Sequence, residues 1–256
     1  MSIERRMLLL NGVALAGGLG PAFFLPTVDG WRVRRGVRPR IYSREEWRAR
    51  HPKGQTIVLN RRPERIVVHH TATQNVEDFS VEAAFRLSRS IQHYHMSKHR
   101  WEDIGEHFTI SRGGHIMEGR NKTLRAIGRG AHVLGAHAAD LNKRAIGIEN
   151  EGIYTKIKPP ARMVKSLVDL LAWLCDEYRL DPYIAIIGHR DVNPTSCPGE
   201  QLYAMLPELR RRVAVQLGLP QRQDARRLMR GPRMYGPIAP FDHGPAIGPL
   251  DSVDPC

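Results

Sequence analysis

One stretch of this chain combines a predicted strand with a histidine, a cysteine and turn residues: Ile186-Ile187-Gly188-His189-Arg190-Asp191-Val192-Asn193-Pro194-Thr195-Ser196-Cys197-Pro198-Gly199. The apolar run that enters it, residues 183–187, predicts a short buried strand, and Asn193-Pro194 predicts a turn. His189 therefore leaves the end of a strand, and the turn brings Cys197 back toward it. Imidazole nitrogen and thiolate sulfur are ligands that zinc prefers, but two ligands do not complete a tetrahedral site.

A second stretch that ends in histidine supplies the third donor. It reads Arg65-Ile66-Val67-Val68-His69-His70-Thr71-Ala72-Thr73, and its β-branched residues predict a strand. Because side chains alternate along a strand, His69 and His70 point to opposite faces and only one can be a ligand. We predict His69. Two histidines and one cysteine leave the fourth position open for water, which is typical of a catalytic rather than a structural zinc.

Three motifs resemble the type 2 N-acetylmuramoyl-L-alanine amidases, the family shared by phage lysozyme-type amidases and peptidoglycan recognition proteins. They occupy residues 68–73, 103–108 and 188–198, and the similarity runs from about Ile41 to Leu217. The resemblance implies an α/β fold in which a central mixed β-sheet is flanked by helices, with a zinc site in a surface groove. It also implies the zinc ligands, namely His69, His189 and Cys197.

The same resemblance implies roles for four further residues. Glu106 stands where many members have a tyrosine. Because some bacterial amidases of the superfamily use a glutamate near the zinc, we expect Glu106 to be the general base. His137 and Asn142 match the family's H-x-x-x-x-N element, which faces the substrate. Thr195 stands where relatives place a catalytic Lys or Thr, and would steady the oxyanion.

Each of these roles has a plainer structural alternative. Glu106 would be an ordinary exposed strand residue, and the glycine-rich loop that carries His137 would be a tight connection. Thr195 would supply a hydroxyl that forms a turn. His93, His95 and His99, near the end of a predicted helix that Ser80 caps, look like a metal cluster, but we expect a surface position because residues two apart on a helix do not face one another.

The activity implied by the resemblance is zinc-dependent hydrolysis of the amide bond between N-acetylmuramic acid and L-alanine of peptidoglycan. One alternative is a non-catalytic peptidoglycan-binding module, although such modules commonly lose the cysteine ligand that Cys197 keeps. Another is a zinc hydrolase of the same fold that acts on a different N-acyl amino acid or peptide. Nucleic acid is not an expected partner, because the basic residues are dispersed and do not belong to a recognised nucleic-acid-binding motif. We expect a monomer.

The chain divides into four predicted segments. Residues 1–26 combine a charged start, Glu4-Arg5-Arg6, with an apolar run too short to span a bilayer comfortably, which predicts an export signal or N-terminal anchor. Its paired arginines resemble a twin-arginine signal. A basic linker follows at 27–40, the zinc amidase domain at 41–217, and a disordered tail rich in Pro, Gly and Arg at 218–256. We therefore expect an exported protein, secreted, periplasmic or associated with the cell wall, that meets a membrane only through an uncleaved signal.

Composition agrees with one globular domain and extensions at both ends. The 256 residues are 41% hydrophobic, enough to bury a core. The net charge of +13 favours polyanionic surroundings, but a solvated basic surface explains it equally well. Residues 160–180 predict a helix with one apolar stripe, and Pro207 predicts a break in a last helical region at 198–217. Of the three cysteines, Cys175 falls in the apolar helix and Cys256 ends the tail, so no disulfide framework is expected.

Overall fold

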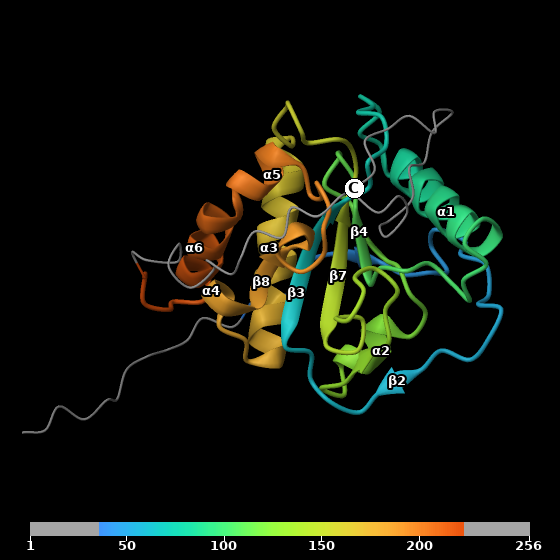
Figure 1. The fold of residues 1–256 in the computed structure, drawn as a ribbon, viewed down its shortest axis with the longest axis horizontal. Coiled ribbons are helices and arrows are strands. Elements are labelled where there is room, and N and C mark those ends of the chain that lie inside the picture. Colours follow the sequence, from blue (N-terminus) through green and yellow to red (C-terminus); the bar gives the residue numbers. More distant parts are fainter. Residues whose placement is uncertain (1–35, 223–256) are drawn as a thin grey trace, which may run out of the picture. The chain divides into compact units, whose positions relative to one another are not determined.

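A six-stranded mixed sheet forms the centre of the computed structural model, which describes residues 36–222 (Figure 1). The strand order is β1-β5-β4-β7-β3-β8. Strand β7 pairs in parallel with β3 and β4, and β8 pairs in parallel with β3, whereas β4 and β5 form an antiparallel hairpin. The strands are β1 (Ile41–Tyr42), β3 (Arg65–His70), β4 (Phe108–Ile110), β5 (Ile116–Glu118), β7 (Ala145–Asn150) and β8 (Ile186–Gly188).

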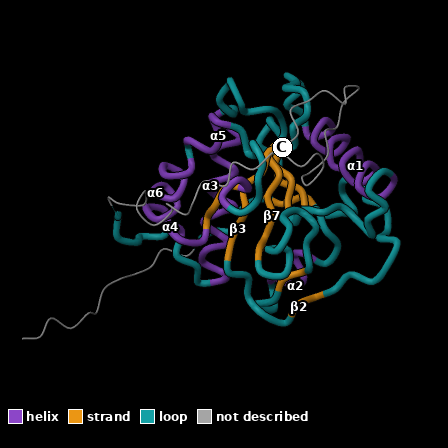
Figure 2. Tube along the Cα trace, in the orientation of Figure 1, coloured by secondary structure: helices purple, strands orange, loops and turns teal. Residues whose placement is uncertain are grey.

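Helices lie on both sides of this sheet. Figures 1 and 2 show α1 on one side and α3 with α6 on the other. The helices are α1 (Val81–Ser97), α2 (Thr123–Ile127), α3 (Ala161–Tyr178), α4 (Pro182–Ala185), α5 (Glu200–Ala204) and α6 (Leu206–Gln216), with a 3-10 turn at His189–Asp191. Strands β2 (Val58–Leu59) and β6 (His132–Val133) form a second, two-stranded sheet. The predicted α/β fold with a central mixed sheet flanked by helices is confirmed.

The main core lies between the sheet and α3. Alternate residues of β3 (Ile66 and Val68) and of β7 (Ile146 and Ile148) pack in one buried cluster with the apolar stripe of α3. Alternation along a strand sends the intervening residues to the other face of the sheet. His69 and His70 are therefore separated by the sheet, as expected from the sequence. His70 lies on the α3 side, where its Nδ1 accepts the backbone N–H of Tyr154 at 3.3 Å.

Most predicted elements are present, and one is wrong in type. The helix predicted at 160–180 is α3, and α6 begins at Leu206 with Pro207 in its first turn. Residues 183–185, predicted as strand, belong instead to α4. Asp181 caps that helix, because its Oδ1 accepts the Tyr183 N–H at 2.9 Å, and Pro182 fits a first helical turn. The buried strand starts only at Ile186.

Short segments beyond the predicted domain borders also contact the domain. The Gly36 N–H donates to Asp176 Oδ2 at 3.1 Å, so the end of the predicted linker lies against α3. At the other border, Arg222 pairs with Asp181 at 2.9 Å. The predicted export signal, most of the linker and the tail with Cys256 lie outside the described residues. Within residues 36–222, no helix has the length and apolarity that crossing a membrane requires.

Candidate metal centre

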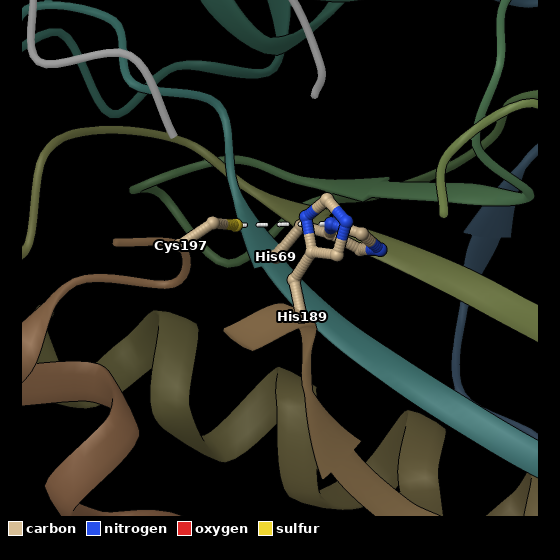
Figure 3. Close-up of side chains that lie close together, drawn as sticks. All are labelled: His69, His189 and Cys197. Atoms are coloured by element: carbon tan, nitrogen blue, oxygen red, sulfur yellow. Dashed lines mark hydrogen bonds between the residues drawn. The ribbon is translucent and has the colours of Figure 1, made fainter. Parts of the chain in front are cut away.

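The carboxyl ends of β3 and β8 bring His69, His189 and Cys197 together (Figure 3). Val68 of β3 pairs with Gly188 of β8, so the residues that follow them, His69 and His189, are neighbours. Their ring centroids are 4.4 Å apart. Cys197 returns from the loop after β8, and its Sγ lies 3.7 Å from His69 Nδ1. One ligand atom from each of the three residues lies within 4.8 Å of the other two.

The loop between His189 and Cys197 is held by its own polar groups. Asn193 Oδ1 lies 3.0 Å from His189 Nε2, and the Cys197 carbonyl accepts the Arg190 N–H at 3.0 Å. Thr195 Oγ1 accepts the Cys197 N–H at 3.0 Å. The Thr195 hydroxyl therefore forms a turn contact that sets the position of the thiol, as its structural alternative requires. Its role at an oxyanion stays a prediction.

The three residues fit a zinc ion by donor type and by spacing. Zinc bonds to nitrogen and sulfur of 2.0–2.3 Å at tetrahedral angles place neighbouring ligand atoms about 3.5 Å apart. The atoms here are close to that arrangement. Burial, and then the neighbouring His189, lower the pKa of His69 to about 4, so its ring is neutral at pH 7. A neutral imidazole has the lone pair that a metal needs.

A carboxylate that the sequence analysis missed stands beside this cluster. Glu149 on β7 is the register partner of His69 on β3, and its Oε1 lies 4.0 Å from His69 Nδ1. Its other oxygen, Oε2, has no hydrogen-bond partner among the described residues. Burial, followed by the charges of Cys197 and Glu106, raises the pKa of Glu149 well above its ordinary value. The sequence feature that could have indicated Glu149 is an acidic residue inside an otherwise mostly apolar stretch, residues 145–150.

Glu106 lies two residues before β4, the strand next to β7 in the sheet. Its Oε1 accepts the Thr109 hydroxyl at 2.9 Å, and Thr109 of β4 is the register partner of Glu149. Burial raises the pKa of Glu106 to about 7. The alternative of an exposed strand residue is wrong, because Glu106 is 1% exposed. The role of Glu106 as general base stays a prediction, and its described contacts are with Thr109 and His95 rather than with the cluster.

His95 corrects the surface prediction for the histidines of α1. It lies four residues after Ile91 on the inner face of the helix, and it is 1% exposed. Its ring packs against Trp101 with centroids 4.6 Å apart, and its Nδ1 lies 3.8 Å from Glu106 Oε2. His93, by contrast, is exposed as predicted. One face of the helix thus carries a titratable group into the interior.

His137 and Asn142 occupy one loop, as the sequence predicts, but their described contacts are with the protein. His137 Nδ1 lies 3.1 Å from the Nε2 of His69. Asn142 Oδ1 accepts the backbone N–H groups of His137 at 2.7 Å and Ala138 at 3.0 Å, which fixes the loop. Contact of either residue with substrate stays a prediction.

Comparison with known proteins agrees with this geometry. Residues 59–200 match the family model described as N-acetylmuramoyl-L-alanine amidase. The chain is 32% identical over 165 residues to peptidoglycan-recognition protein LB of Drosophila melanogaster, covering 64% of this chain and 66% of that protein. It is 32% identical over 171 residues to the N-acetylmuramoyl-L-alanine amidase of Sus scrofa, covering 66% of this chain but 27% of that one. The chain thus spans only part of the length of these relatives.

Two solved structures extend the likeness to the fold. Drosophila PGRP-LB superposes with a TM-score of 0.57 at 30% identity, over 65% of this chain and 92% of that one. The N-acetylmuramoyl-L-alanine amidase LysC from Clostridium intestinale URNW gives a TM-score of 0.53 at 25% identity, over 71% and 99%. The family match covers more than half of the chain and contains His69, His189 and Cys197. The chain belongs to the N-acetylmuramoyl-L-alanine amidase family, in which amidases and peptidoglycan recognition proteins share one fold.

Proposed function

We propose that the protein is a zinc-dependent N-acetylmuramoyl-L-alanine amidase that hydrolyses the amide bond between N-acetylmuramic acid and L-alanine of peptidoglycan. The observation that carries the proposal is the convergence of donor atoms from His69, His189 and Cys197 within 4.8 Å, with the Glu149 carboxylate beside them. Zinc at this site would polarise the scissile carbonyl and lower the pKa of a water to about 7. Relatives named as amidases support the same reaction.

Two carboxylates are candidates for the proton transfers. A general base must lie within hydrogen-bond reach of the attacking water, and it later returns the proton to the leaving amine. We assign this role to Glu149, because it contacts His69 at the cluster, whereas Glu106 contacts Thr109 and His95. Glu106 raises the pKa of Glu149, so one of the two tends to hold a proton while the other is ionised. In this assignment Glu106 is the partner carboxyl group that influences the protonation of Glu149, and it is not the base itself.

Peptidoglycan fragments are the proposed substrate. Structures of a point mutant of Drosophila PGRP-LB and of PGRP-LE were solved with tracheal cytotoxin, a monomeric diaminopimelic acid-type peptidoglycan. The loop of His137 and Asn142 and the Thr195 turn border the cluster and are the proposed contact sites for such a ligand. Export of a monomeric enzyme, proposed from the first residues of the sequence, would place it where peptidoglycan lies.

The test is mass spectrometry of the fragments released from purified peptidoglycan. Free stem peptides that begin at L-alanine are expected, and both a zinc chelator and Cys197→Ala should abolish them. Cys175→Ala is the matched control, since Cys175 lies in the core cluster of α3 and should leave release unchanged. Intact glycopeptides, with binding retained, would overturn the amidase and favour the recognition module.

A further inference from the structure

The two ring nitrogens of His69 face different partners. Nδ1 lies 3.7 Å from Cys197 Sγ and 4.0 Å from Glu149 Oε1, so it points to the candidate metal site. Nε2 lies 3.1 Å from His137 Nδ1. The rings of His69 and His137 meet nearly edge-on, at an interplanar angle of 83°. One hydrogen bond therefore joins His69 to a second histidine on the side away from Cys197.

Two glycines make the space that the His137 ring occupies. A Cβ at Gly147 of β7 would lie 2.4 Å from His137 Cγ, and a Cβ at Gly135 would lie 2.6 Å from His137 Cδ2. Both distances are too short for any side chain without movement of the ring. Asn142 in addition holds the His137 backbone through its Oδ1 at 2.7 Å. Gly147 is the reason that a ring can lie over β7, two residues before Glu149.

The hydrogen bond constrains which nitrogen of His69 carries a proton. A neutral imidazole has one N–H, and a bond between two ring nitrogens needs the proton on one of them. A metal ligand at Nδ1 requires that Nδ1 be bare, so the proton must be on His69 Nε2, and His137 Nδ1 must accept it. Histidine ligands in metal sites commonly donate their other N–H in this way, which sets tautomer and ring orientation.

We propose that His137 is a positioning residue, whose Nδ1 accepts the Nε2 proton of His69 and so holds the bare Nδ1 of His69 toward the metal site. This goes beyond the substrate contact predicted for His137 from the sequence. The inference rests on the zinc site of the proposed function, because only a metal ligand at Nδ1 requires the proton on Nε2, but it does not depend on amidase activity. A residue that only contacts substrate changes KM, but a positioning residue changes zinc affinity in the absence of substrate.

The test combines zinc titration with nitrogen-15 NMR of the histidine rings in the zinc-loaded full chain. In the wild type, His69 should carry its proton on Nε2. His137→Leu should lower zinc affinity about 10–100-fold and mix the His69 tautomers. His137→Asn should retain most of the affinity, because its Oδ1 can accept at the place of Nδ1. His115→Leu is the control, as His115 contacts the Phe79 carbonyl and Tyr42 rather than the cluster.

A second variant reaches the same hydrogen bond without changing a histidine. Gly147→Ala places a methyl group on the His137 ring and should cause a loss of zinc affinity like that of His137→Leu. This variant decides the matter if His137→Leu does not fold. Wild-type zinc affinity in His137→Leu, or a His69 that carries its proton on Nδ1 in the wild type, would overturn the inference. A wild type that binds zinc but releases no stem peptides would refute the proposed amidase and leave this inference standing, whereas a wild type that binds no zinc would overturn both.

Discussion

His69 on β3 and Glu149 on β7 stand side by side in parallel register, with 4.0 Å between Nδ1 and Oε1. Adjacent strands lie about 4.8 Å apart, so the backbone hydrogen bonds of the sheet set this distance, and no loop has to hold it. Thr109 of β4 continues the row and contacts Glu106. His69 and Glu149 thus belong to one side of a rigid sheet, which suits a site that must keep its geometry, whereas Glu106 precedes β4 and reaches the row through Thr109.

Glu149→Gln should lower kcat for amide hydrolysis about 10²–10⁴-fold, the usual contribution of a general base, while zinc stays bound. Glu106→Gln keeps Glu149 in place and should have the smaller effect. The measurement is kcat on a soluble muropeptide, with zinc content determined for each variant. A large loss in Glu106→Gln together with a small one in Glu149→Gln would return the role of base to Glu106, as the sequence predicts.

The stability of the metal-free protein should depend on pH through Glu106. Its pKa is about 7 in the fold against an ordinary 4.5, so between these values the folded state binds more protons than the unfolded state. The free energy of unfolding therefore falls as pH rises through this window, by up to about 3 kcal/mol. The glutamine of Glu106→Gln cannot ionise, so the free energy of unfolding of this variant should not fall in this way.

Buried histidines have the opposite effect on the pH dependence of stability, so the contribution of Glu106 must be measured as a difference between two proteins. The pKa values of His69 and His107 are lowered to about 4 and about 3, chiefly by burial. Below pH 6.5 the unfolded state binds more protons at these rings, so they reduce stability as pH falls. The informative quantity is the difference between wild type and Glu106→Gln in urea denaturation at several pH values. A difference that stays constant from pH 4.5 to 7 would contradict the prediction.

The sequence was sufficient for residues whose positions follow from local chemistry. Seven residues separate His189 from Cys197, and Asn193-Pro194 predicts a turn between them, so the proximity of these two could be predicted. The place of His69 beside them depends on the pairing of β3 with β8, and only the resemblance to the amidases allowed it to be predicted. Glu149 could not be predicted, because its place depends on the pairing of β7 with β3, and the sequence does not specify which strands become neighbours. The burial of His95 could not be predicted for a similar reason. Spacing along a helix says which residues share a face, but the side turned to the sheet depends on tertiary packing.

Zinc should stabilise the protein against heat, because a ligand that binds only the folded state adds its binding free energy to that of folding. At a free zinc concentration 100 times the dissociation constant, the gain is about 2.7 kcal/mol. Cys197→Ala should lose this gain, whereas Cys175→Ala should keep it. Differential scanning fluorimetry with and without zinc measures the shift in Tm. An equal shift in Cys197→Ala would show that the stabilising ion binds elsewhere.

Asp103 should matter for stability and not for zinc, although it stands in one of the motifs that mark the family. Its carboxylate pairs with Arg44 Nη1 at 3.1 Å, with side chains only 3% and 8% exposed. It also accepts hydrogen bonds from Gln92 Nε2 at 2.8 Å and the Asn121 N–H at 2.9 Å. It therefore ties α1 to the loop after β5.

Asp103→Ala should lower the free energy of unfolding by about 3–5 kcal/mol, because it leaves the buried guanidinium of Arg44 without its counter-charge. The exposed pair of Glu64 and Arg144, 3.5 Å apart, is the matched control, and Glu64→Ala should cost no more than about 1 kcal/mol. Urea denaturation gives both values, and zinc titration of the folded variants should give wild-type affinity. Equal losses in the two variants would mean that the buried pair contributes no more than a surface one. A loss of zinc affinity in Asp103→Ala would instead connect this motif to the metal site.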